Sequence, residues 1–232
     1  MIARFPFYYL LLLLLGPVAF LPADTRPHWI PMGSVSRELE QHALHHREFL
    51  QNRSGEIQRA GLRAIRSDLD RFERADMRIA LVPIVVDMLG MEYRILSVSS
   101  GYQVDSPTRA EALLLLADLG GGQARLQLRQ SVGIDEDPSV RATAASLLAR
   151  EPWADPDDDL LAVSRALLRA TRRGGPEAEV ARLLSAAHTL SGNAWNREIP
   201  ELLEALGSIA GGNYPSSLRR KAFSILEELA RR

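Results

Sequence analysis

The fold of this chain is decided by residues 137–150, which read DPSVRATAASLLAR. The segment opens with an acidic residue and a proline, and both residue types are favoured where helices begin. Apolar side chains follow at Val140, Ala144, Leu147 and Leu148, which are offsets 0, 4, 7 and 8. These offsets fall on one face of an α-helix, so the segment is predicted to form an amphipathic helix over 138–150.

The same pattern recurs in alternate predicted helices on both sides of this segment. The first apolar positions are separated by 32, 40 and 38 residues, and they are Thr108, Val140, Val180 and Leu218. The positions one turn later are small or apolar, and they are Ala112, Ala144, Leu184 and Ala222. A single pair of helices cannot cover its own apolar face, so repeated pairs must stack on one another. The sequence therefore predicts an array of helical hairpins.

Glycine- and proline-rich breaks divide the rest of the chain into further predicted helices. From residue 105 onward these helices are 107–119, 123–132, 138–150, 157–172, 176–190, 197–210 and 215–231. Earlier in the chain they are 34–52, 56–73 and a buried helix over 76–90 that is kinked at Pro83. A strand over 84–88 is the alternative for part of this last segment. Residues 92–104 could form a short hairpin or an irregular helix, and we expect a helix followed by a loop.

Three segments resemble the first helix of a HEAT repeat, in which an acidic residue, often a proline, and a valine-arginine pair precede a small residue. They are residues 137–148, 214–222 and 106–112. The resemblance covers about residues 105–232 and, more weakly, 55–90. It implies an α-solenoid whose inner helix face binds another macromolecule. The sequence departs from the pattern at Val180, which is followed by Ala181 rather than arginine, and at the irregular residues 92–104. A generic bundle of helical hairpins would also satisfy the helix pattern.

The predicted fold class is therefore all-α, an α-solenoid of stacked HEAT-like helical hairpins preceded by an apolar signal or anchor helix. Residues 1–23 are the signal peptide or signal anchor, and 24–33 are a linker. Residues 34–104 form an N-terminal helical region, and 105–232 form the HEAT-like repeat domain.

The N-terminal segment is typical of an export signal. Arg4 supplies a positive charge, residues 10–15 are consecutive leucines, and Ala23 offers a small residue for cleavage before Asp24. Alternatively, residues 5–23 contain no charge and could remain as a membrane anchor; a buried core helix is the third reading. The first two interpretations place residues 24–232 outside the cytoplasm, in the periplasm, in the medium or at the outer face of the membrane.

Composition excludes several kinds of site. The chain has no cysteine, which excludes disulfides, thiolate zinc sites and cysteine nucleophiles. Its formal net charge is −1, so no overall positive charge favours nucleic acid, and we expect no nucleic-acid partner. No motif for nucleophilic catalysis or phosphate binding is present.

The histidines and the acidic clusters are explained more simply by helix surfaces, packing and helix caps than by metal sites. His42, His45 and His46 could supply two metal ligands from one helix, but we expect them to lie on a polar helix surface. His188 occupies an apolar repeat position and is expected to be packed. The carboxylates at 155–159 and 135–137 are expected to cap helix N-termini through the helix dipole, with a cation site as the alternative. We therefore predict no catalytic residue, no metal site and no cofactor.

Partner binding is the role we assign to a set of arginines and tryptophans. Arginines recur at spacings of four, three and one over 165–173, which could form a basic strip for an acidic partner or phosphate. A solvated face that interacts with Glu177 and Glu179 is the simpler alternative. Tryptophans near loops could mark an interface or pack between helices. The candidate partner-binding residues are Arg165, Arg169, Arg172, Arg173, Trp153 and Trp195.

The predicted function is that of an exported, non-enzymatic HEAT-like scaffold that binds a protein partner. A membrane-anchored assembly or stability factor, tethered through residues 5–23, is the first alternative. An enzyme on a helical-repeat frame, of the lyase type, is the second. HEAT-like hydroxylases need paired histidine-glutamate dipeptides, and none of the five histidines here is followed by glutamate.

Overall fold

The computed structural model describes residues 37–95, 104–150, 156–194 and 199–231, which contain ten α-helices and no strand. In chain order the helices are α1 (Arg37–Leu50), α2 (Gly55–Ser67), α3 (Arg74–Ile95), α4 (Ser106–Leu119), α5 (Gly122–Ile134), α6 (Pro138–Arg150), α7 (Pro156–Arg172), α8 (Glu177–Asn193), α9 (Pro200–Gly211) and α10 (Ser216–Ala230). The all-α prediction is thus confirmed for the part of the chain that the structure describes.

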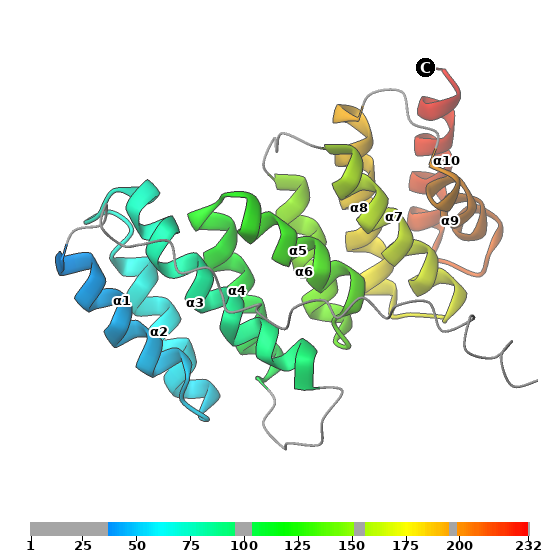
Figure 1. Cartoon of the computed structure of the whole chain (residues 1–232). Helices are drawn as coiled ribbons and strands as arrows, with labels where there is room; N and C mark the ends of the chain where they lie inside the picture. Colours follow the sequence, from blue (N-terminus) through cyan, green and yellow to red (C-terminus); the bar gives the residue numbers. More distant parts are fainter. Residues whose placement is uncertain (1–36, 96–103, 151–155, 195–198, 232) are drawn as a thin grey trace, which may run out of the picture. The chain divides into compact units, whose positions relative to one another are not determined.

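Contacts between helices follow a simple rule (Figure 1). Each helix packs against the next helix in the chain or against the one after that, so the helices form two rows. One row contains α2, α4, α6, α8 and α10; the other contains α1, α3, α5, α7 and α9. Neighbours within a row meet at an interface that we call a seam. This succession of neighbours is compatible with an α-solenoid.

The repeated apolar positions line the seams. Val140, Ala144 and Leu148 of α6 are fully buried, and so are Ala112 of α4 and Ala222 of α10. Alanine at the middle position allows neighbouring helix backbones to approach closely. The periodicity that predicted the hairpin array therefore marks the side chains that hold neighbouring hairpins together.

The first three helices differ in detail from the predicted ones. The strand over 84–88 is wrong, because α3 is a continuous helix with Pro83 inside it. A proline removes one backbone hydrogen bond, and here many buried apolar contacts, including Leu81, Val85 and Leu89, support the helix around it. The second helix ends at Ser67, where the N–H of Asp68 donates back to the carbonyls of Ala64 and Ile65. Residues 92–95 are helical, as expected.

Later helices match their predicted ranges within a few residues. Asp105 fixes the start of α4 because its carboxylate accepts a hydrogen bond from the N–H of Thr108 at 2.7 Å. Helix α8 runs past the predicted break at Ser191 to Asn193.

No helix among the described residues is both long enough and apolar enough to span a membrane. The predicted signal or anchor (1–23), the linker (24–33) and most of the predicted loop (96–103) lie outside the described residues.

We expect Ala144→Arg to unfold the array, because it forces an unpaired charge into the seam around α6. The free energy of unfolding should fall by about 4 kcal/mol or more, measured by urea denaturation followed by circular dichroism. The matched control is Ser146→Arg on the exposed face of the same helix, which should change stability by less than about 0.5 kcal/mol. Equal stability of the two variants would contradict the assignment of the seam.

Candidate functional site

The four predicted partner-binding arginines lie on or directly after α7, and we call them the arginine strip: Arg165, Arg169, Arg172 and Arg173. Arg165 pairs with Glu201 of α9 at 3.1 Å, and Arg172 pairs with Glu204 of the same helix. The side chains of Arg165 and Arg172 remain 57% and 62% exposed. The expected interaction with Glu177 and Glu179 of α8 is therefore replaced, for these two arginines, by ion pairs to α9.

Arg169 lies deeper than its neighbours in the arginine strip. Its guanidinium donates a hydrogen bond to the carbonyl of Gly133, near the end of α5, at 2.8 Å. Burial lowers the pKa of Arg169 below its ordinary value, and the nearby charges of Arg141 and Arg173 lower it further. The negative charge of Glu179 opposes this effect, so the centre of the strip contains several arginines with one carboxylate near them. The other two candidates, Trp153 and Trp195, lie outside the described residues.

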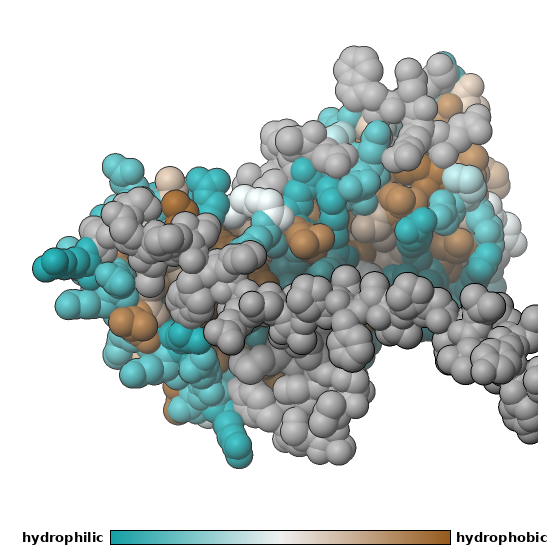
Figure 2. All heavy atoms as spheres, viewed as in Figure 1, coloured by the Kyte–Doolittle hydropathy of each residue, from teal (hydrophilic) through white to brown (hydrophobic). Residues whose placement is uncertain are grey.

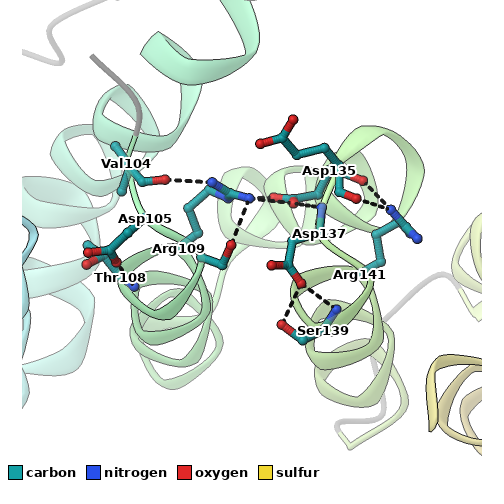
Figure 3. Close-up of polar contacts among 10 residues, drawn as sticks. Val104, Asp105, Thr108, Arg109, Asp135, Asp137, Ser139 and Arg141 are labelled. Atoms are coloured by element: carbon teal, nitrogen blue, oxygen red, sulfur yellow. Dashed lines mark hydrogen bonds and ion pairs between the residues drawn. The ribbon is translucent and has the colours of Figure 1, made fainter. Parts of the chain in front are cut away.

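A buried ion pair joins α4 to the turn between α5 and α6 (Figure 3). Both nitrogens at one edge of the Arg109 guanidinium donate to the Asp135 carboxylate at 2.9 Å, and Nη1 donates to the carbonyl of Val104 at 2.6 Å. The side chains of Arg109 and Asp135 are 3% and 1% exposed. Two parallel hydrogen bonds fix the relative position of two charged groups, so this pair sets the register of the seam.

Similar pairs cross other seams. Arg125 and Arg129 of α5 bind Asp159 of α7, whose side chain is fully buried. Arg141 of α6 donates to Glu179 of α8 at 2.7 Å. The prediction that the carboxylates at 155–159 and 135–137 serve as helix caps is therefore incomplete. Asp159 lies in the first turn of α7 and also binds arginines of α5. Asp135 follows α5 directly, accepts a hydrogen bond from the N–H of Asp137 and also binds Arg109 of α4.

Asp137 does cap α6, as predicted (Figure 3). Its carboxylate accepts hydrogen bonds from the N–H and the hydroxyl of Ser139 at 2.7 and 2.6 Å. Hydrogen bonds from the Ser106 and Ser139 hydroxyls, together with backbone N–H groups of α6, lower the pKa of Asp137 to about 2.

The three clustered histidines do not share one environment. His45 is exposed, and its ring lies edge-on against Phe49 at 4.7 Å between centroids. His46 is 4% exposed, so the expectation of a polar surface is wrong for this residue. Its Nε2 atom lies 3.4 Å from the carboxylate of Asp68, and Nδ1 of His42 lies 3.8 Å from the same carboxylate oxygen. Burial lowers the pKa of His46 and so favours its neutral form, although the nearby carboxylate of Asp68 acts in the opposite direction.

His188 is only partly packed, and its Nε2 lies 3.1 Å from the carboxylate of Glu228 on α10. Ala181 stands where the other repeats have an arginine, but the contact of His188 with Glu228 still places a polar interaction across the seam between α8 and α10.

Large apolar side chains that are exposed are spread over five helices. They are Leu44, Ile57, Leu126, Ile134, Leu203 and Phe223. Figure 2 shows hydrophilic side chains between the apolar ones on the described part of the face in view. Apolar residues scattered in this way are common on protein surfaces and do not mark a site.

Comparison of the chain with protein family models, with curated proteins and with solved structures found no match.

We expect Asp135→Ala to lower the free energy of unfolding by about 3–5 kcal/mol, because it leaves the buried guanidinium of Arg109 without its counter-ion. The control is Glu204→Ala, which breaks an exposed pair and should cost less than about 1 kcal/mol. A double variant, Arg109→Met with Asp135→Leu, should recover most of the loss, since it removes both buried charges. Urea denaturation of the three variants measures these differences, and similar losses for Asp135→Ala and Glu204→Ala would contradict the assigned role.

The low pKa of Asp137 predicts a pH-dependent contribution to stability. An unfolded aspartate has a pKa of about 3.9, whereas the folded value is about 2. The charged form is therefore favoured by folding, and its contribution is present above about pH 4 and is lost as the pH falls toward 2. Wild type should exceed Asp137→Ala in urea midpoint at pH 6, and the difference should shrink between about pH 4 and 2. A difference that stayed constant over this range would contradict the assignment.

Proposed function

We propose that this chain is an exported HEAT-like α-solenoid that acts as a non-enzymatic scaffold for a protein partner with an acidic surface. The predicted signal segment at 1–23 supports export. The arginine strip of α7 is the proposed contact surface, and the single observation that carries this proposal is its exposed positive charge.

The arrangement of helices supports the solenoid. Each helix contacts its neighbours in the same row, and most helices also contact the next helix in the chain. Most repeated positions of the HEAT-like pattern are buried, whereas Leu218 and Leu226 of α10 are half-buried. Arrays of this kind expose long, continuous helix faces, and such faces commonly serve as binding surfaces.

The charge of the arginine strip supports an acidic partner. Arg165, Arg172 and Arg173 are exposed, and Arg169 lies among positive neighbours that lower its pKa. Glu201 and Glu204 of α9 compensate part of this charge. Exposed ion pairs contribute only about 0–1 kcal/mol each, so a carboxylate of a partner can replace either glutamate at little cost.

The test is a crosslinking pull-down with the full chain and a variant that carries Arg165→Ala, Arg172→Ala and Arg173→Ala. The matched control carries Arg53→Ala, Arg63→Ala and Arg182→Ala, three exposed arginines elsewhere that remove the same amount of charge. The strip variant should recover at least about tenfold less partner at physiological salt, since each lost contact to a charged group weakens binding. Equal recovery by the strip variant and the control would overturn the proposed surface.

A further inference from the structure

Three metal-ligating side chains from two elements converge beside the first helical hairpin. His42 and His46 lie one helical turn apart on α1, and Asp68 lies directly after α2. One potential ligand atom from each of the three lies within 4.8 Å of the other two. The Oδ2 atom of Asp68 is the common neighbour, at 3.8 Å from Nδ1 of His42 and 3.4 Å from Nε2 of His46.

His46 is the residue that most needs a further partner. It is 4% exposed, and neither of its ring nitrogens has a hydrogen-bond partner among the residues that the structure describes. A polar group that is buried without a partner costs free energy. Its Nε2 atom points toward Asp68, but the distance of 3.4 Å leaves that contact short of a good hydrogen bond.

We propose that His42, His46 and Asp68 form a binding site for a zinc(II) ion. A tetrahedral zinc ion bound at about 2.0–2.1 Å holds its ligand atoms about 3.4 Å apart. The separation of His46 from Asp68 equals this value, and that of His42 from Asp68 is 0.4 Å longer, so binding requires a small movement of His42. Two imidazoles and one carboxylate are a donor set for zinc-type transition metals, whereas magnesium and calcium prefer oxygen ligands. The spacing of two histidines by four residues places both rings on one face of a helix, as metal binding requires.

The three side chains leave one position of a tetrahedral ion open. The side chains of His42 and Asp68 are 32% and 22% exposed, so solvent can supply the fourth ligand. The ring of Phe72 lies edge-on to His42 at 5.5 Å and limits access from that side. Because Asp68 belongs to the end of α2 and both histidines belong to α1, the ion would fasten the two helices of this hairpin to each other.

His45 provides a natural control within the same helix. It precedes His46 directly, but its ring is exposed and faces Phe49 rather than Asp68. If zinc bound to any neighbouring histidines of this helix, His45 would contribute as much as His42. The proposed site does not include His45.

The experiment measures zinc binding to the full-length chain without a histidine tag, by competition with a chromogenic chelator. We expect about one zinc ion per chain and no displacement by magnesium or calcium, given the ligand set. His42→Gln and Asp68→Asn should each weaken binding by at least about tenfold. His45→Gln should bind zinc as wild type does, and circular dichroism checks that each variant is folded.

A second measurement distinguishes a specific zinc site from weak, nonspecific binding of zinc to the surface. Zinc should raise the melting temperature of wild type and of His45→Gln, because a ligand that binds the native state stabilises it. It should not raise that of His42→Gln. The proposal is overturned if wild type binds no zinc at micromolar concentrations, or if His45→Gln weakens binding as much as His42→Gln. The arginine strip lies on α7, so a negative result here leaves the proposed partner surface untouched.

Discussion

The apolar face of each helical hairpin must be covered by the next hairpin, and the other features of the described array depend on this constraint. The alanine at the middle of the repeated pattern, seen at Ala112, Ala144 and Ala222, brings neighbouring helices of a row close together. Close approach excludes water from the seam. Any charged group that enters the seam then requires an opposite charge, and Arg109 with Asp135 meets that requirement through two parallel hydrogen bonds.

The ion pairs that cross the seams differ in burial, and this difference separates two roles. Arg109 and Asp135 are almost completely buried, whereas Arg165 and Arg172 of α7 are more than half exposed. A buried pair adds little net stability over apolar residues, but it penalises every register that would separate its two charges. An exposed pair costs little to open. The same residue types thus fix the helices of one seam and form exposed pairs between α7 and α9.

Most of the helices could be predicted from sequence, and the polar contacts between them could not. The spacing of Val140, Ala144 and Leu148 reflects local geometry, so it locates a helix and its buried face directly. Asp159 also suits a helix N-terminus, and no sequence signal shows that Arg125 and Arg129 reach it across a seam. The cluster of His42, His46 and Asp68 was missed for a related reason. Two histidines one turn apart were visible in the sequence, but the turn after α2 brings in Asp68 from 22 residues farther along the chain.

Asp118 of α4 illustrates how hairpins that are not neighbours can influence each other. One carboxylate oxygen contacts Arg66 of α2 at 2.7 Å, and the other contacts Arg150 of α6 at 3.1 Å. The side chain is only 14% exposed, so the ion pairs of two seams together offset the cost of removing one carboxylate from water. Stability of a repeat array is usually a sum of nearest-neighbour terms, whereas a shared carboxylate adds a term that spans three helices. Arg66 and Arg150 share one carboxylate, so we expect the energies of these two seams to be coupled rather than strictly additive.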